Sequence, residues 1–230
     1  MAKKIFLGVG HGGNDSGAVA NGFKEKDLNL AIALACRDEL ARHGVTVGMS
    51  RTKDENDALT DEIKECNAFK PDLALDIHNN AGGGDGAEVF HHYGGGTGKT
   101  LAENILAEIV KIGQNSRGAK IKKNAQGKDY FGFIRQTSCP AVIVECAFVD
   151  NKNDVAIIDT SAEQKTMGIA IAKGVLKTLG IAYIEPKPVV TETNVGGKIY
   201  KVQVGAYTNR TNAENMVKKL KSDGYDAIIV

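Results

Sequence analysis

The chain has no tryptophan, only four prolines and four cysteines among 230 residues, and a formal net charge of only +1. No apolar run approaches the roughly 20 residues that a helix needs to cross a bilayer, so we expect no membrane partner. The charged residues are spread along the chain without a basic stripe that carries interleaved aromatic residues. Nucleic acid is therefore not an expected partner either.

The cysteines form no CxxC pair and have no zinc-finger spacing, lying at Cys36, Cys66, Cys139 and Cys146. We expect them to be free, mostly buried thiols, as is typical of a chain made in a reducing cytosol. The N-terminal stretch MAKKIFLGVGHGG has too short an apolar segment for a secretory signal peptide and no cleavage site after it. We therefore predict synthesis in the cytoplasm without a signal peptide.

The alternation of apolar strands with helical patterns predicts an α/β domain with a twisted, mostly parallel sheet flanked by helices. A 42% apolar fraction beside 25% charged residues is typical of a chain with a sizeable core. A capping box, Ser161-x-x-Gln164, is expected at the start of the last helix of this domain. The predicted strands are 4–9, 45–50, 72–78, 86–92, 130–135 and 141–147, and the predicted helices are 26–43, 60–69, 98–112 and 161–179.

The texture of the sequence changes after Gly180, which predicts a second, smaller unit. We expect a first domain over residues 1–180 and a linker over 181–197, where EPKPVVTETNVGG has no helical or strand period. Residues 198–230 have the pattern of one small β-α-β unit, with Thr211-x-x-Glu214 at the start of its helix. Such a unit buries too little surface to be comfortably stable alone.

Several candidate functional residues fall at one edge of the predicted sheet. Ligands of parallel α/β sheets gather beyond the carboxyl ends of the strands. His11 follows the first strand, His78 ends the strand LALDIH, and Glu145 lies near the end of AVIVE. Glu25 opens the first long helix, which begins at the same edge.

Two histidines and one carboxylate with a fourth position open make a catalytic zinc site, and a second carboxylate there can move a proton. Each residue also has an ordinary interpretation. A histidine at a strand end is often a hydrogen-bonded surface group, and Glu25 can complement a helix dipole. Glu145 is harder to explain in this way, because burying an unpaired carboxylate within an apolar strand is costly. The glycine-rich GHGGNDSGA lacks the spacing of a phosphate-binding loop.

Three further polar residues have open interpretations. Asp76 alternates to the same side of its strand as His78, so it either orients a ligand or is an ordinary strand-end charge. His91 and His92 are adjacent, so in a strand at most one of them faces the site. We keep this pair as tuning or surface residues.

Three motifs in order carry a family resemblance: VGHGGNDSGAVANGFKEKDLNL, DLALDIHNNA and RQTSCPAVIVECAFVDN. Together they resemble the zinc-dependent N-acetylmuramoyl-L-alanine amidases of the amidase_3 family over residues 3–178. That family hydrolyses the amide between the lactyl group of muramic acid and L-alanine in peptidoglycan. Asp76 departs from the family pattern, which has a small polar residue there. The resemblance implies that His11, Glu25 and His78 are zinc ligands and that Glu145 is the catalytic carboxylate. It also suggests that Asn79 and Arg135 contact the substrate.

The C-terminal unit resembles half of a SPOR-type peptidoglycan-binding module, whose full form pairs two β-α-β halves. Two chains supplying the two halves would form a homodimer. Amidases of this type without a signal peptide act on the wall after release or lysis, either as phage endolysins or as sporulation autolysins, and the sequence does not separate these settings. Two other functions stay open: a catalytically inactive peptidoglycan-binding protein, and a zinc hydrolase such as a deacetylase that acts on another wall bond.

Overall fold

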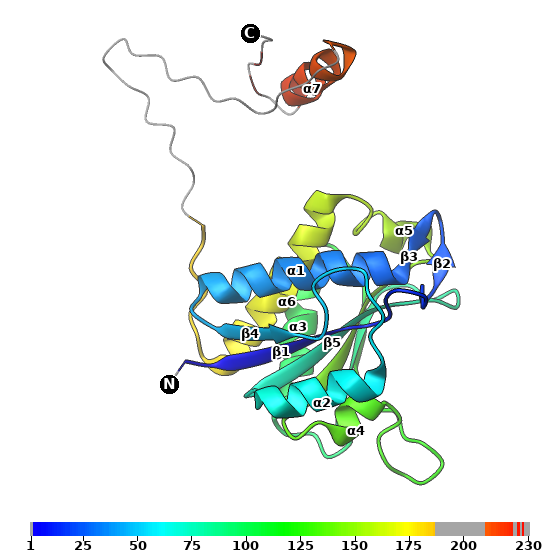
Figure 1. Cartoon of the computed structure of the whole chain (residues 1–230), viewed down its shortest axis with the longest axis vertical. Helices are drawn as coiled ribbons and strands as arrows, with labels where there is room; N and C mark the ends of the chain where they lie inside the picture. The colour runs from blue at the N-terminus through cyan, green and yellow to red at the C-terminus, as the bar shows by residue number, and fades with distance from the viewer. Residues whose placement is uncertain (1, 187–209, 223–224, 226, 228–230) are drawn as a thin grey trace. The chain divides into compact units, whose positions relative to one another are not determined.

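The computed structural model describes residues 2–186, 210–222, 225 and 227 (Figure 1). The chain divides into two compact units, Met1–Glu185 and Pro186–Val230. In the second unit α7 (Arg210–Ser222) confirms the helix expected there. The strands predicted on either side of this helix, and most of the predicted linker 181–197, lie outside the described residues.

The first unit is built on a six-stranded sheet whose order is β4-β1-β5-β8-β6-β7. All neighbouring strands run parallel except β6 and β8, which are antiparallel, so the prediction of a mostly parallel sheet flanked by helices is confirmed. A two-stranded hairpin, β2 (Val19–Ala20) and β3 (Phe23–Lys24), stands apart from it. The sheet strands are β1 (Lys4–Val9), β4 (Thr46–Met49), β5 (Leu73–Asn80), β6 (Ala87–His91), β7 (Ser116–Lys120) and β8 (Ala141–Phe148).

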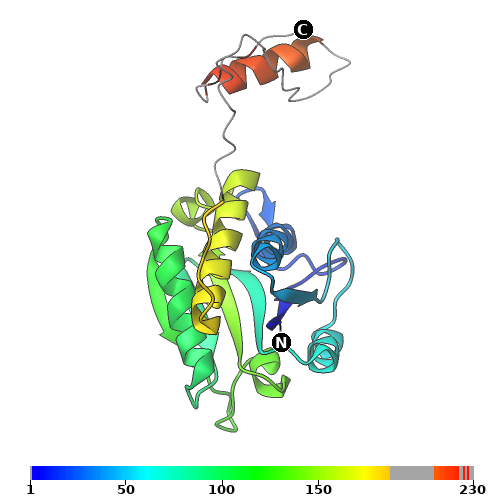
Figure 2. The same ribbon diagram turned by 90° about the vertical axis from the view of Figure 1, so that its left-hand side faces the viewer.

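Helices cover both faces of this sheet and bury two apolar cores (Figures 1 and 2). On one face lie α1 (Glu25–Arg42), α3 (Thr97–Lys111) and α6 (Ser161–Leu179), with α6 packed between the other two. The other face carries α2 (Leu59–Phe69) and α4 (Gly132–Gln136), while the short α5 (Lys152–Val155) contacts β8. The central strands β1, β5 and β8 are almost wholly buried, as is typical of parallel strands covered on both faces.

The structure corrects three local expectations. Residues 130–135 form no strand, because α4 begins at Gly132 and tucks Phe133 and Ile134 into the core beside α2. Strand β7 was not predicted, since its sequence SRGAK has no apolar alternation and it pairs only with β6 at the sheet edge. The capping box of α6 is formed by Thr160 and Glu163, one residue before the expected pair.

The helices and the cysteines bear on two features of the composition. Within the described part of the chain, no helix is both long and apolar enough to cross a membrane. All four cysteines are free, and Cys36, Cys66 and Cys146 are buried, which confirms the expectation of buried thiols.

Candidate metal centre

Three elements bring His11, Glu25 and His78 together at the carboxyl edge of the sheet. Strands β1 and β5 are parallel neighbours, with Val9 beside Ile77, so the loop after β1 and the end of β5 emerge next to each other. The β2–β3 hairpin then returns the chain, and the backbone N–H of Glu25 donates to the carbonyl of Ala18 at 2.9 Å. One potential ligand atom from each of the three side chains lies within 4.8 Å of the other two.

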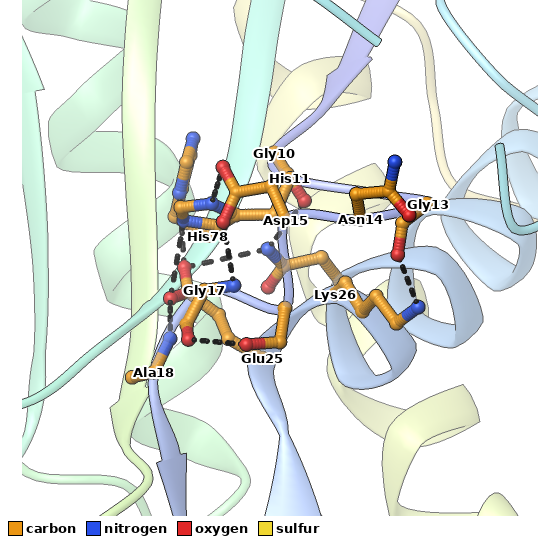
Figure 3. Close-up of polar contacts among 12 residues, drawn as sticks. Gly10, His11, Gly13, Asn14, Asp15, Gly17, Ala18, Glu25, Lys26 and His78 are labelled. Atoms are coloured by element: carbon orange, nitrogen blue, oxygen red, sulfur yellow. Dashed lines mark hydrogen bonds and ion pairs between the residues drawn. The ribbon is translucent and has the colours of Figure 1, made fainter. Parts of the chain in front are cut away.

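Glu25 lies between the two imidazole rings (Figure 3). Its Oε2 is 3.2 Å from Nε2 of His11, and its Oε1 is 3.0 Å from Nδ1 of His78. The rings meet edge to face, with centroids 5.1 Å apart. Two nitrogens and a carboxylate oxygen therefore converge on one small space.

Each histidine has a second carboxylate on its other nitrogen. Nδ1 of His11 is 2.8 Å from Oδ2 of Asp15, and Nε2 of His78 is 3.1 Å from Oδ2 of Asp76. Carboxylates in such places fix the tautomer and the orientation of metal-binding histidines. For Asp76 the structure therefore favours contact with a ligand over an ordinary strand-end charge.

The electrostatics of these groups suit a divalent cation. The hydrogen bond to Glu25 raises the pKa of His11 despite partial burial. Burial lowers the pKa of His78, but the charge and hydrogen bond of Asp76 and the hydrogen bond to Glu25 outweigh it and place that pKa well above the ordinary value. Burial likewise opposes the charge of Glu25, yet its hydrogen bonds to both histidines lower its pKa. The carboxylates thus favour positive charge at the two imidazoles, and a dication can supply that charge when the imidazoles are deprotonated.

The backbone of the GHGG loop is shaped around this cluster. His11 has a φ of 63°, an unusual left-handed conformation for a residue other than glycine. A Cβ at Gly10 would lie 2.1 Å from the ring of His78. The glycine therefore allows the loop to pass close to the second histidine.

Replacing Gly10 with alanine is expected to weaken binding of added Zn²⁺ at least about tenfold, because the methyl group displaces the ring of His78. Competition with a chromophoric chelator measures this affinity. Gly98→Ala is the matched control, since a Cβ there makes only ordinary contacts from 3.6 Å outward. Equal affinities for the two variants would show that the ring tolerates the methyl group.

The family described as N-acetylmuramoyl-L-alanine amidase matches residues 5–177, which is most of the chain. The chain belongs to this amidase family. A second match, described as the SPOR domain, covers residues 169–230. These two matches confirm the two family resemblances that the sequence motifs carry.

Similar proteins span most of this amidase chain. A sporulation-specific N-acetylmuramoyl-L-alanine amidase of Bacillus subtilis (strain 168) is 32% identical over 99% of this chain and 84% of its own length. An endolysin of Bacillus phage SPP1 is 35% identical over 79% of this chain and 68% of its own. The solved catalytic domain of CwlV, an N-acetylmuramoyl-L-alanine amidase from Bacillus (Paenibacillus) polymyxa var. colistinus, has 26% identity and a TM-score of 0.70 over 78% of this chain and 99% of that one.

A pocket of about 260 Å³ opens beside the three candidate ligands of this amidase and is lined by His11, His78 and Glu145. Glu145 lies on β8 next to His78 of β5 in the parallel register. Its Oε2 is buried and has no hydrogen-bond partner among the described residues. Burial raises the pKa of Glu145 to about 7, against the opposing charge of His78. Such a carboxylate is suited to accept and return a proton near neutral pH.

The raised pKa of Glu145 makes a stability prediction for the metal-free protein. Between the ordinary value of 4.5 and about 7 the native state keeps a proton that the unfolded state has released. Stability therefore falls as the pH rises through this window and levels off above it. Glu145→Gln removes this penalty, so its advantage over the wild type in urea unfolding should grow by about 2 kcal/mol between pH 5 and pH 8. Glu103→Gln on α3 is the control, and a pH-independent difference for Glu145→Gln would contradict the assignment.

The other predicted site residues lie outside this pocket. Asn79 is 2% exposed, donates its side-chain amide to Asn29, and donates its backbone N–H to Glu25 at 3.2 Å, so it supports a candidate ligand from behind. Arg135 lies on α4 and donates to the carbonyls of Asp129 and Tyr130. For both, contact with substrate stays a prediction.

His91 and His92 are not part of the group of potential ligands formed by His11, Glu25 and His78. Nδ1 of His91 is 2.8 Å from the carbonyl of His92. Nε2 of His92 is 3.1 Å from the carboxylate of Asp129. These contacts favour the interpretation of the pair as residues outside the site.

The sequence analysis missed the residues that hold the GHGG loop. Asn29 is fully buried and donates to the carbonyl of Gly10 at 2.9 Å, while Arg51 is 2% exposed and donates to the carbonyls of Val9 and Gly10. A buried arginine bonded to backbone carbonyls leaves no signal in a single sequence. Asn29 could have been found from the sequence, because it is a polar residue on the apolar side of α1, four residues after Glu25.

Proposed function

We propose that this chain binds one zinc ion through His11, Glu25 and His78 and hydrolyses the amide between N-acetylmuramic acid and L-alanine in peptidoglycan. The observation that carries the proposal is the convergence of these three side chains within 4.8 Å, with Glu145 in the pocket that His11 and His78 line. Membership of the amidase family supports the choice of this amide as the bond that is cleaved.

The donor set fits zinc. Two imidazole nitrogens and one carboxylate oxygen, with a fourth position open, are the ligands of catalytic zinc sites. Asp15 and Asp76 supply the outer carboxylates that such histidines usually have. When bound, zinc would polarise the amide carbonyl and lower the pKa of a water molecule.

Glu145 is the proposed general base and acid. Its unpartnered Oε2 is free to accept a proton from the attacking water and then to protonate the departing amine of L-alanine. Glu25 is less suited to this task, because both of its oxygens already face the histidines. Leu59 and Phe131 give the pocket an apolar wall beside the polar groups.

The biological setting proposed is wall lysis from within the producing cell. The names of two relatives, a sporulation-specific amidase and a phage endolysin, support a sporulation autolysin and an endolysin equally. We propose synthesis in the cytoplasm and action on the wall after release or lysis. Electron microscopy of cells that express the chain in the cytoplasm, with and without a pore-forming holin, tests this; wall loss that needs the holin is expected, and secretion without it would contradict the proposal.

We also propose a homodimer formed through the C-terminal unit, which matches the SPOR domain. Residues 198–230 of this unit have the pattern of a β-α-β unit. Light scattering should therefore give twice the chain mass of 24.4 kDa. A monomeric mass together with a well-ordered tail by NMR would contradict the dimer.

Digestion of purified cell wall tests the proposed reaction. We expect release of new L-alanine amino groups, no new reducing ends and no acetate, with the release abolished by a chelator and restored by zinc. Acetate in place of amino groups would indicate a deacetylase. Wall binding without any product would indicate an inactive binding protein.

A further inference from the structure

Two buried acidic side chains line the pocket beside His78. Glu62 of α2 is 5% exposed and Asp76 of β5 is 3% exposed. A Cβ at Gly8 would lie 1.8 Å from Oε1 of Glu62 and 3.0 Å from Oδ1 of Asp76, so both oxygens converge on the space that this glycine leaves open. The two carboxyl groups are close enough for Asp76 to raise the pKa of Glu62.

The hydrogen bonds of this pair are incomplete unless one of the two residues carries a proton. Oδ2 of Asp76 is 3.1 Å from Nε2 of His78. Oδ1 of Asp76 and Oε1 of Glu62 are buried and have no donor among the described residues. Buried polar atoms of native proteins are almost always paired, and one proton between the carboxyl groups satisfies them.

The proton belongs to Glu62. Burial and the negative charges of Asp76 and Asp57 raise the pKa of Glu62 well above its ordinary value. Oδ2 of Asp76 already lies 3.1 Å from Nε2 of His78, so Oδ1 is the oxygen left to accept a hydrogen bond from Glu62. A neutral Glu62 is then a hydrogen-bond donor and Asp76 an acceptor from both sides.

The two outer carboxylates of the metal cluster differ in their need for such support. The side chain of Asp15 is 69% exposed and water can solvate it, whereas that of Asp76 is 4% exposed and depends on protein partners. A buried carboxylate with one oxygen unsatisfied would be free to turn away from the imidazole. Glu62 supplies the missing donor.

We propose that Glu62 is a positioning residue of the metal centre, which donates a hydrogen bond to Asp76 and thereby holds Asp76 against Nε2 of His78, so that Nδ1 faces the metal. This inference rests on the proposed function, since it takes His78 as a zinc ligand. Glu62 itself lies outside the cluster of potential ligand atoms found among the described residues.

Zinc affinity of the full chain, measured by competition with a chromophoric chelator, tests the proposal without any turnover. Glu62→Gln keeps a donor of the same length, and its dissociation constant should stay within about twofold of the wild type. Glu62→Met keeps the length without a donor and should weaken zinc binding about tenfold, the cost of losing an outer partner of a ligand. Glu65→Met, on the exposed side of the same helix, is the matched control and should bind as the wild type does.

A double-mutant cycle tests whether Glu62 acts through Asp76. Asp76→Ala should weaken zinc binding by about 10–100-fold. Adding Glu62→Met to Asp76→Ala should then cause no further loss, since the residue that Glu62 positions is gone. Equal losses from Glu62→Met in both backgrounds would overturn the proposal.

The remaining outcomes are also decisive. A tenfold loss in Glu62→Gln would show that a negative charge is needed at this position, and an unchanged affinity in Glu62→Met would show that the donor is not; either overturns the proposal. Thermal unfolding of the metal-free variants verifies their folding, and if Glu62→Met does not fold, Glu62→Gln decides alone. A wild-type chain that binds no zinc would instead refute the proposed function, and the inference with it.

Discussion

Glu145→Gln is expected to lower kcat for release of L-alanine amino groups from peptidoglycan by about 10²–10⁴-fold, the usual contribution of general acid–base catalysis. Glutamine has nearly the same shape but does not accept the proton of the attacking water. The zinc content should be unchanged, because Glu145 is outside the ligand cluster. Single-turnover kinetics on purified wall, with zinc measured by elemental analysis of the same sample, gives both quantities.

Glu103→Gln is the control for this experiment, because Glu103 is an exposed carboxylate on α3 whose contact is an ion pair with Lys99 at 3.7 Å. It should retain the wild-type rate. If Glu145→Gln also kept the wild-type rate, another residue would be the base. If it lost zinc together with activity, Glu145 would be a ligand.

His78→Ala is expected to lose the metal itself. Removing an outer-shell partner of a zinc ligand costs 10–100-fold in affinity, so removing one of three ligands should cost more than about 100-fold. The activity should disappear at stoichiometric zinc. Chelator competition measures the affinity, and the wall assay at matched zinc measures the activity.

His92→Ala is the matched histidine control, because the side chain of His92 is 48% exposed and pairs with Asp129 away from the pocket. This variant should bind zinc as the wild type does. Wild-type affinity in His78→Ala would remove His78 from the ligand set.

The candidate site followed from the sequence because its residues lie where strand topology places them. His11 follows the buried strand β1, and His78 lies near the end of the buried strand β5. Their apolar runs predict parallel strands whose carboxyl ends share an edge. Choosing between Glu25 and Glu145 as a ligand needed the family resemblance, and the structure gives a physical reason for the choice. Glu25 bridges both rings, whereas Glu145 lies in the pocket wall.

The features that the sequence did not reveal depend on tertiary contacts. Residues 130–135 have an aromatic, strand-like composition, yet a helix begins at Gly132 and buries Phe133 beside α2. Strand β7 has no apolar pattern because it is an edge strand. Glu62 reads as an ordinary acidic residue in the first turn of α2, and only the fold places it against Asp76.

The central claim is that His11, Glu25 and His78 hold one zinc ion that Glu145 faces without binding. Anomalous diffraction at the zinc edge from crystals of the zinc-loaded chain tests it most directly. The account predicts one strong peak bonded to Nε2 of His11, a carboxylate oxygen of Glu25 and Nδ1 of His78, with Glu145 unbound beside the open position. A peak elsewhere, a peak with Glu145 among its ligands, or no peak at these three side chains would contradict it.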